Sequence, residues 1–298
     1  MRIVAIVNPI SGRGMTSETA ADRIAMIRAA LDRRGLDGSV VLTQRAGHAR
    51  EIAGRAVEAA ADLVLTWGGD GTVNEVGSAL AGSSTALGLV PAGSGNGLAG
   101  GLAIPREPNA AIAAALDGRV RAVDVGLLND RAFFNVAGLG FDAHVALLFN
   151  QRPPGRRGPL PYVMIGFREG VRYAGLTYNI TLVDDHRTTT TVHRALLVAF
   201  ANGVEYGMGM QIAPAARLDD GLLDCCVVED RPVLSRILDA RHLLRGKIER
   251  APRLLMRTVR SATVEADHDI VYHVDGEPGV AGKRLVVTVR PGALLVRS

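Results

Sequence analysis

The sequence predicts an N-terminal α/β domain with a parallel sheet, followed by a C-terminal antiparallel β-sandwich domain. Strand and helix patterns alternate up to Arg119, whereas strand patterns dominate after it. The chain has 298 residues, 48% of them hydrophobic, which is too long for most single cores and ample for two. We therefore expect domains over residues 1–119 and 120–298. No Pro/Ser-rich linker separates them, so we expect them to lie close together.

In the first domain, short apolar runs that stop at Gly, Pro or Asn predict strands. Ile24, Ile27 and Leu31 share one face at helical spacing, which predicts the longest helix. The expected strands are Ile3–Val7, Val40–Leu42, Leu63–Thr66 and Ala86–Val90, and the expected helices are Thr16–Arg34, His48–Ala61 and Thr72–Leu80. This alternation is typical of a parallel sheet covered by helices on both faces.

In the second domain, apolar runs bounded by Gly, Asp and Pro predict an antiparallel sheet or sandwich. The expected strands are Val120–Leu127, Ala132–Val136, Thr177–Val183, Thr188–Ala201, Leu222–Val228, Ser261–Glu265, Ile270–Val274 and Leu285–Val289, with helical patterns at Val145–Asn150 and Arg231–Arg245. Adjacent Cys225 and Cys226 point to opposite faces of a strand, so we expect buried apolar side chains without a disulfide or metal clip. A reducing, cytoplasmic location follows from this.

Charge and composition limit the partners. The net charge of +4 and the isoelectric point near 9.4 fit a nucleotide, a nucleic acid or an acidic membrane surface. Aromatic residues make up only 4%, which argues against stacking on nucleic acid, and we expect no nucleic-acid partner. No apolar run reaches the roughly 18 residues of a membrane span. The N-terminal apolar run is too short for a signal peptide.

Three glycine-rich turns follow expected strands of the first domain, at residues 8–14, 68–72 and 93–97. Such turns lie at the carboxyl ends of parallel strands, where ligands bind. Glycine lets the backbone approach a phosphate, and the next helix directs free N–H groups at it. Thr72 and Glu75 fit a capping box, which predicts a helix starting after Gly71. The P-loop and complete dinucleotide motifs are absent, because no G-x-x-x-x-G-K-[ST] occurs and residue 17 is Ser.

Asp70 stands inside the second of these turns. A carboxylate beside phosphates is repelled unless a cation or a proton intervenes. Its presence therefore suggests Mg²⁺ or contact with an attacking hydroxyl. The alternative is a turn aspartate bonded to its own backbone.

The segment Gly68-Gly69-Asp70-Gly71-Thr72-Val73-Asn74-Glu75 resembles the signature of the diacylglycerol kinase catalytic-domain superfamily. That superfamily includes sphingosine and ceramide kinases and bacterial soluble lipid kinases. Four further segments resemble family motifs, namely Asn8–Gly12, Pro91–Ala99, Asp219–Leu223 and Asp275–Glu277. The matches run from residue 8 to residue 277, which is nearly the whole chain.

The resemblance implies an ATP-dependent lipid kinase that uses Mg²⁺, with the nucleotide in a cleft between the domains. The implied nucleotide-binding residues are Asn8, Pro9, Ser11, Gly12, Thr43, Gly68, Gly69, Asp70, Gly71, Thr72, Asn74, Gly93 and Ser94. Thr43 would be among the adenine and ribose contacts, and Ser94 would contact phosphate. By the same resemblance, the carboxylate of Asp220 and the main-chain oxygens of Arg217 and Leu222 would hold a structural Mg²⁺.

Phosphoryl transfer requires positioning, charge neutralisation and an oriented nucleophile. We expect a lipid hydroxyl to attack the γ-phosphate while Glu277 takes its proton, with Asp275 beside it and Asp70 orienting the acceptor or a Mg²⁺-bound water. Asp275-Gly276 reads equally as a hairpin turn. Asp124 is a further candidate. Asn135, Gly140, Phe141 and Asp142 also match a family stretch, for which a core or turn role is expected.

Gly97 departs from bacterial diacylglycerol kinases, which usually carry an Asp there, and the segment is closer to the sphingosine kinase version. The acceptor is therefore open between diacylglycerol and a sphingoid-type lipid. The basic segment Arg152–Pro159 is either a contact for anionic lipid at the membrane surface or a solvated loop. Two other functions stay open, a kinase on a soluble acceptor resembling NAD kinases and a non-catalytic nucleotide- or lipid-binding module. An edge strand of the second domain would allow a homodimer.

Overall fold

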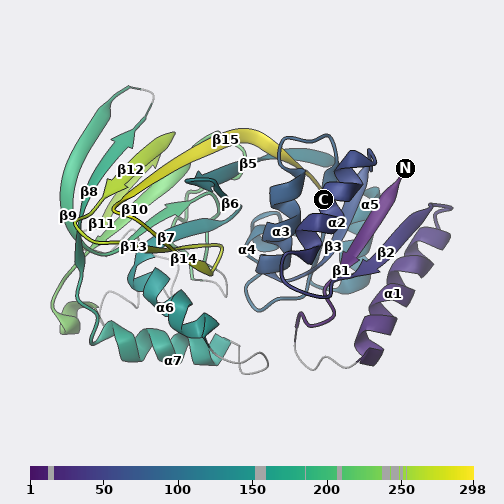
Figure 1. Ribbon diagram of the computed structural model, residues 1–298, viewed down its shortest axis with the longest axis horizontal. Coiled ribbons are helices and arrows are strands. Elements are labelled where there is room, and N and C mark those ends of the chain that lie inside the picture. The colour runs from purple at the N-terminus through teal and green to yellow at the C-terminus, as the bar shows by residue number, and fades with distance from the viewer. Residues whose placement is uncertain are drawn as a thin grey trace. The chain divides into compact units, whose positions relative to one another are not determined.

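The computed structural model describes residues 1–12, 17–151, 159–184, 186–206, 210–236, 242, 248, 251–252 and 254–298 (Figure 1). The chain forms two compact units. Unit 1 consists of Met1–Val123 and Gly292–Ser298, and unit 2 consists of Asp124–Pro291. The end of the chain thus returns to unit 1, and nothing in the sequence pattern indicates this return. No helix in the described part of the chain is long and apolar enough to span a membrane.

Unit 1 is built on a parallel sheet in the order β2-β1-β3-β4, as the alternating pattern predicts. Its strands are β1 (Ile3–Val7), β2 (Gly38–Leu42), β3 (Leu63–Gly68) and β4 (Ala86–Pro91). β3 is buried along its whole length because neighbouring strands and helices cover it. The last residues of β15 (Arg284–Arg297) add a further parallel strand, with Val296 opposite Leu87.

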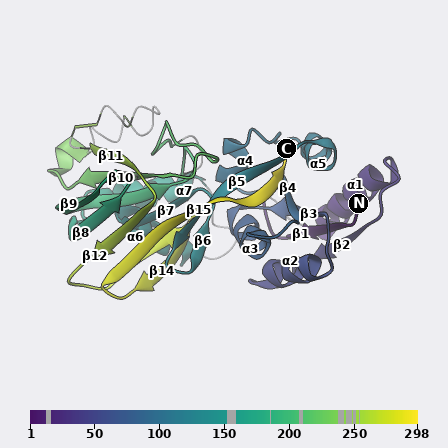
Figure 2. The same cartoon turned by 90° about the horizontal axis from the view of Figure 1, so that it is seen from above.

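Helices cover both faces of this sheet. Helix α1 (Ser17–Asp32) packs against α5 (Pro108–Asp117) on one face, and α2 (His48–Glu58) packs against α3 (Asp70–Leu80) on the other (Figure 2). The sequence analysis missed α5 and the short α4 (Gly97–Gly101). The signal for α5 was present, because Pro108 occupies its first turn and Glu107 caps the N–H groups of Asn109 and Ala110.

The predicted capping box at Thr72 is wrong. Helix α3 begins at Asp70, so Thr72 already lies inside it, and the N-cap residue Gly69 has no side chain to form a cap. Glu75 instead accepts hydrogen bonds from the N–H groups of Gly47, at 2.8 Å, and Ala49, at 3.1 Å. These groups belong to the start of α2, so the Glu75 carboxylate caps a neighbouring helix rather than its own.

Unit 2 is an antiparallel, β-rich unit, as predicted. Its strands are the last part of β5 (Val120–Leu128), β6 (Arg131–Phe133), β7 (Val136–Gly140), β8 (Leu176–Val183), β9 (Thr188–Ala201), β10 (Leu223–Glu229), β11 (Leu254–Val259), β12 (Ser261–Glu265), β13 (Ile270–Val274), β14 (Glu277–Ala281) and the first part of β15. The long β9 pairs with β7, β8 and β10. Its alternate residues therefore serve two cores, for example Phe200 in one and Ala199 in the other.

Cys225 and Cys226 on β10 behave as predicted. Both thiols are free and buried, and Cys225 joins the core of Phe200 while Cys226 joins the core of Ala199. Burial raises the pKa of the Cys226 thiol to about 12, which keeps it protonated.

Several elements of unit 2 differ from the prediction. The run Ala132–Val136 is split between β6 and β7, and β11, β14 and helix α7 (Pro159–Gly170) were missed. The helical pattern at Val145–Asn150 is the end of α6 (Phe141–Asn150). Residues 152–158 of the basic segment, and residues 237–241 and 243–245 of the helical pattern Arg231–Arg245, lie outside the described residues.

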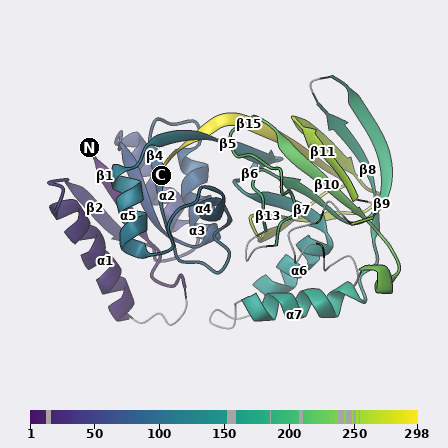
Figure 3. The same ribbon diagram turned by 180° about the vertical axis from the view of Figure 1, so that it is seen from behind.

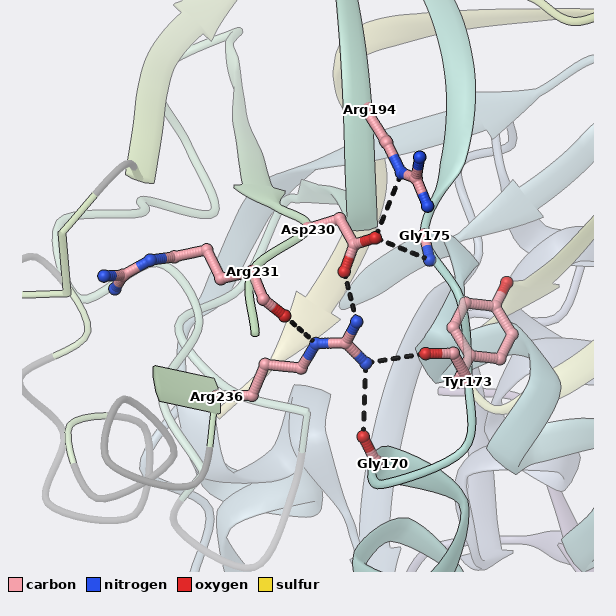
Figure 4. A network of polar contacts seen from close by, with 7 residues as sticks. All are labelled: Gly170, Tyr173, Gly175, Arg194, Asp230, Arg231 and Arg236. Atoms are coloured by element: carbon pink, nitrogen blue, oxygen red, sulfur yellow. Dashed lines mark hydrogen bonds and ion pairs between the residues drawn. The ribbon is translucent and has the colours of Figure 1, made fainter. Parts of the chain in front are cut away.

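Helix α7 packs against α6 (Figure 3), and a polar network fixes its C-terminal end. The carboxylate of Asp230 accepts hydrogen bonds from Arg236, from Arg194 at 3.1 Å and from the N–H of Gly175 at 3.1 Å (Figure 4). Arg236 also donates to the carbonyls of Gly170, Tyr173 and Arg231. One guanidinium group thus ties the end of α7 to the start of β8 and the end of β10.

Candidate functional site

The first two predicted loops of unit 1 meet at the carboxyl ends of β1 and β3. In the order β2-β1-β3-β4 the chain leaves these two strands in opposite directions, which makes their ends the place where open parallel sheets bind ligands. The N–H of Asn8 donates to the carbonyl of Trp67 at 2.9 Å. The amide of Asn8 also donates to the hydroxyl of Thr72 at 2.8 Å. The loop after β1 is therefore tied to the loop after β3.

Asp70 ties the loop after β3 to the loop after β4. One carboxylate oxygen accepts the N–H of Asn96 and the other accepts the N–H of Gly97, both at 2.8 Å. These N–H groups belong to the start of α4, which has no other side-chain cap. A Cβ atom on Gly95 would lie 2.6 Å from the same carboxylate, so only glycine fits there. The alternative that Asp70 is bonded only within its own turn is thus wrong, because its carboxylate joins two loops.

Asn96 shapes the loop after β4 from within. It adopts a left-handed conformation with φ of 57°, which asparagine tolerates better than most residues. Its side chain accepts the N–H of Gly93 at 2.8 Å and donates to the Gly93 carbonyl at 2.6 Å. Gly93 in turn faces Gly69, where added Cβ atoms would come within 3.1 Å or less of the opposite Cα. The two loops therefore touch through backbone alone.

Arg23 on α1 holds the loop after β1 and was missed by the sequence analysis. Its guanidinium donates to the carbonyl of Asn8 at 2.8 Å, to the carbonyl of Ser11 at 2.8 Å and to the Ser11 hydroxyl at 3.2 Å. It lies over the ring of Trp67 at 5.4 Å. Burial lowers its pKa from the usual range for arginine. An arginine at the seventh position of a helix carries no sequence signal for such a contact, because the contact exists only when the helix packs beside the loop.

The structure brings most of the predicted nucleotide residues together. Asn8, Pro9, Ser11, Gly12, Gly68, Gly69, Asp70, Gly71, Thr72 and Gly93 lie on the three loops and the first turn of α3. The N–H of Thr43, just after β2, donates to the carbonyl of Val7 at 2.9 Å, which places Thr43 beside the first loop. Ser94 is exposed on the third loop, and Asn74 lies in the second turn of α3.

The first turn of α3 can receive an anion. Its first backbone bond runs from the N–H of Val73 to the carbonyl of Gly69, so the N–H groups of Asp70, Gly71 and Thr72 are not used inside the helix. Free N–H groups at a helix start favour phosphate. A small cavity of about 10 Å³ nearby is lined by Gly68, Asp70, Val73, Leu89, Val90, Pro91, Asn96, Leu98 and Ala99.

The Asp70 carboxylate also fits a cation. Each of its oxygens accepts one N–H bond from the third loop, which leaves lone pairs on both oxygens. Mg²⁺ is bound in proteins through one or two carboxylates together with phosphate oxygens and waters. The donor chemistry at the three loops therefore fits a Mg²⁺–phosphate group.

In unit 2, Asp275 and Glu277 have different surroundings. Asp275 forms a tight hairpin turn with Gly276 between β13 and β14, so the hairpin alternative is correct. Its carboxylate accepts the N–H groups of Phe134 and Asn135 at 2.9 Å and of Val136 at 3.2 Å. Glu277 is exposed, and its carboxylate makes no hydrogen bond to any described residue. The Asp275 carboxylate thus anchors the turn to the backbone of residues 134–136, whereas the Glu277 carboxylate is exposed.

The predicted structural metal site lies near the start of β10. The carboxylate of Asp220 accepts the N–H of Leu222 at 3.0 Å, and that of Asp124 accepts the N–H of Gly221 at 2.6 Å. Burial and the nearby Asp220 raise the pKa of Asp224 to about 6, a concentration of negative charge that a cation would relieve. Within the described residues, no group of three or more His, Cys, Asp or Glu side chains is arranged to hold a metal. Main-chain oxygens, as expected for Arg217 and Leu222, would have to complete the site.

The other family-matching residues of unit 2 have core or turn roles, as expected. Asn135 donates to the carbonyl of Glu205. Gly140 has a positive φ of 91° at the start of α6, and Phe141 packs edge-on against Tyr173. Asp142 is buried in a polar cluster.

Comparison with protein families gives two matches that together span most of the chain. Residues 2–128 match the diacylglycerol kinase catalytic domain. Residues 135–298 match the YegS C-terminal NAD kinase beta sandwich-like domain. The first match contains the three loops, and the second contains the hairpin of Asp275.

Curated relatives align over nearly their full length. A protein of Chromohalobacter salexigens named "Probable lipid kinase YegS-like" is 33% identical, with 86% of this chain and 82% of the relative covered. One of the same name from Cronobacter sakazakii is 30% identical over 94% of this chain and 97% of its own. A diacylglycerol kinase of Staphylococcus saprophyticus is 28% identical over 92% of this chain and 88% of its own. The crystal structure of a diacylglycerol kinase from Bacillus anthracis superposes with a TM-score of 0.72 at 20% identity, covering 99% of this chain and 96% of that one, which shows a shared fold.

The bond between the second and third loops is open to a stability test. Replacing Asp70 with Ala leaves the N–H groups of Asn96 and Gly97 without their acceptor, which should lower the free energy of unfolding by about 1–3 kcal/mol. Trp67 is the single tryptophan and is buried in unit 1, so its fluorescence in urea reports this unit. Asp37→Ala, at an exposed position in the same unit, serves as the control. Equal unfolding midpoints for Asp70→Ala and the unaltered protein would contradict the assignment.

Proposed function

This chain belongs to the diacylglycerol kinase family and is a lipid kinase, and from that premise we propose that it transfers the γ-phosphate of ATP to a lipid hydroxyl. The observation that carries the proposal is the junction of three glycine-rich loops at the carboxyl ends of β1, β3 and β4, joined through Asp70. The free N–H groups at the start of α3 are suited to phosphate oxygens, and glycine allows the backbone to come close.

In the proposed binding mode, each loop has its own task. Asn8, Pro9, Ser11 and Gly12 follow β1 and are held by Arg23, and they are assigned to the nucleotide together with Thr43. Gly68–Thr72, Asn74, Gly93 and Ser94 are assigned to the phosphates. Asp70 would hold Mg²⁺, which neutralises charge on the transferred phosphate when it is bound. Gly97 contributes to Asp70 through its backbone N–H, so the absence of a carboxylate at position 97 leaves that bond intact.

We assign proton removal to Glu277 alone. The lipid hydroxyl oxygen forms a bond to the γ-phosphorus, the bond from that phosphorus to ADP breaks, and Glu277 accepts the hydroxyl proton. The Glu277 carboxylate makes no hydrogen bond to any described residue, which supports this role because a base needs an unused lone pair. Asp275, whose oxygens bind three backbone N–H groups, is assigned to holding the turn. The acceptor class remains diacylglycerol or a sphingoid-type lipid.

The exposed face of α7 supports contact with a membrane surface. Met164 and Phe167, 62% and 69% exposed, lie one turn apart on the helix, and the exposed Val171 follows directly after its end. Arg168, whose side chain is 74% exposed, lies next to this face. Apolar side chains flanked by basic ones are typical of helices that dip into an anionic lipid interface. Arg236 donates hydrogen bonds to the carbonyls of Gly170 and Tyr173, so the C-terminal end of the helix that carries this face is fixed in place.

The kinase proposal predicts transfer of labelled γ-phosphate from ATP, with Mg²⁺, into lipid in mixed micelles. Because Glu277 is assigned as the base, Glu277→Ala should lower kcat by about 10²–10⁴-fold while ATP binding persists. Asp70→Ala should weaken both ATP binding and turnover. Glu265→Ala, an exposed carboxylate of unit 2, should keep kcat within about twofold. A Glu277→Ala protein as active as the unaltered one would rule out the assigned base, and labelling of water-soluble acceptors alone would rule out the lipid.

The membrane contact predicts that Phe167→Glu weakens binding to vesicles containing phosphatidylglycerol. Replacing an exposed aromatic side chain that would insert into the lipid with a negative charge, which anionic lipid repels, should lower the partition coefficient by roughly tenfold or more, measured by co-sedimentation. Val192→Glu is the matched control, because Val192 is an equally exposed apolar residue on β9 of the same unit. Equal losses from both substitutions would attribute the effect to net charge and not to α7.

A further inference from the structure

A buried polar cluster lies directly behind the hairpin that carries Glu277. His273 and Asp142 are only 3% and 6% exposed. Nε2 of His273 lies 3.2 Å from Oδ2 of Asp142, and the hydroxyl of Tyr206 donates to the same oxygen at 2.8 Å. The other oxygen of Asp142 accepts the N–H of Ala143 at 2.8 Å. The proposed mechanism uses none of these side chains.

The hydrogen bonds define which nitrogen of His273 carries the proton. The N–H of Gly276 donates to Nδ1 at 3.3 Å, so Nδ1 is the acceptor. Nε2 then carries the hydrogen and donates to Asp142, whose carboxylate is only an acceptor. The imidazole therefore connects a buried carboxylate on one side to the backbone of the turn on the other.

The turn bonds its two central N–H groups outside the hairpin. Asp275 and Gly276 form a two-residue loop with φ of 48° and 85°, a left-handed pair for which Asp-Gly is a preferred sequence. In such a loop neither central N–H pairs across the hairpin. The N–H of Asp275 instead donates to the carbonyl of Val136 at 2.9 Å, and the N–H of Gly276 donates to His273. Glu277 is the next residue, so its backbone position follows directly from these two bonds.

Close packing indicates that the cluster has a fixed geometry. A Cβ atom on Gly138, in the neighbouring β7, would lie 2.0 Å from Oδ2 of Asp142 and 2.7 Å from Nε2 of His273. Gly138 pairs directly with His273 across the two strands. The backbone of β7 therefore approaches the imidazole with no side chain between them, and any larger residue at position 138 would displace His273 or Asp142.

We propose that His273 is a positioning residue for the kinase reaction, which holds the Gly276 N–H through Nδ1 and so fixes Glu277 where it removes the hydroxyl proton. This inference rests on the proposed role of Glu277. A histidine that only satisfies Asp142 in the core would need the Nε2 contact but not the Nδ1 contact. The Nδ1 contact is therefore required only by the positioning role, whereas the Nε2 contact is enough for a structural role.

Two substitutions separate the contacts. The amide oxygen of His273→Asn can occupy the place of Nδ1 and accept the Gly276 N–H, but the side chain is too short to reach Asp142. The amide of His273→Gln reaches the place of Nε2 and can donate to Asp142, but offers Gly276 no acceptor. Tyr206→Phe is a third variant, which removes a bond to Asp142 and leaves the turn untouched.

If His273 has a positioning role, the variant with the lower kcat should be the one with the higher melting temperature. His273→Gln should lose about tenfold to hundredfold in kcat with an unchanged KM for ATP, since a displaced base affects the chemical step. His273→Asn should lose less than threefold in kcat yet melt at a lower temperature than His273→Gln, because Asp142 has lost a partner. Tyr206→Phe should lower the melting temperature with kcat retained. Hydrogen exchange at the Gly276 amide should be accelerated in His273→Gln and not in His273→Asn.

The outcomes distinguish this inference from the proposed function. If Glu277→Ala is inactive but His273→Gln keeps its kcat, the positioning role is overturned and the base assignment stands. If losses of kcat follow losses of melting temperature across all three variants, His273 has only a structural role. If Glu277→Ala is fully active, the proposed base fails, and the Gly276 exchange rates then report whether the His273 bond to the turn exists at all.

Discussion

The bonds from the Asp70 carboxylate to the N–H groups of Asn96 and Gly97 are the constraint on which the candidate nucleotide site depends. They cap a helix of five residues that has no cap of its own, and they fix the loop after β4 against the loop after β3. Glycines at 69, 93 and 95 allow the approach, and Asn8 adds the first loop. A single carboxylate therefore joins two of the glycine-rich loops while keeping lone pairs for a cation.

In unit 2 another carboxylate, that of Asp275, also binds backbone N–H groups from a separate segment. The carboxylate of Asp275 binds the backbone N–H groups of residues 134–136, and His273 binds the N–H of Gly276 in the turn itself. Both contacts stabilise a left-handed turn that places Glu277, whose carboxylate makes no bond to a described residue. In unit 2 the two acids of the motif differ in their contacts, because Asp275 binds backbone N–H groups while the exposed Glu277 is left for the proposed proton transfer. In unit 1 the single carboxylate of Asp70 makes the structural bonds and keeps lone pairs for a cation.

Much of this organisation could be predicted from the sequence. The three loops after β1, β3 and β4 were predicted because Gly, Asn and Asp after short apolar runs have a local physical meaning, and the burial of both cysteines followed from strand alternation. Roles that depend on distant contacts could not be predicted. Glu75 caps α2 instead of α3, Arg23 holds a loop from a different element, and His273 meets residues 131 and 67 positions away. Each of these contacts joins residues far apart in the sequence, so predicting it requires the order of the strands in the sheet.

The claim that three loops of unit 1 form one nucleotide-binding surface is tested most directly by hydrogen exchange at backbone amides, with and without a non-hydrolysable ATP analogue and Mg²⁺. The account predicts that amides of residues 8–12, 69–72 and 93–97 gain protection together and at the same ligand concentration. It also predicts that Asp70→Ala, which releases the third loop, loses the protection of all three at that concentration. Protection of one loop alone, or protection confined to residues outside these loops, would contradict it.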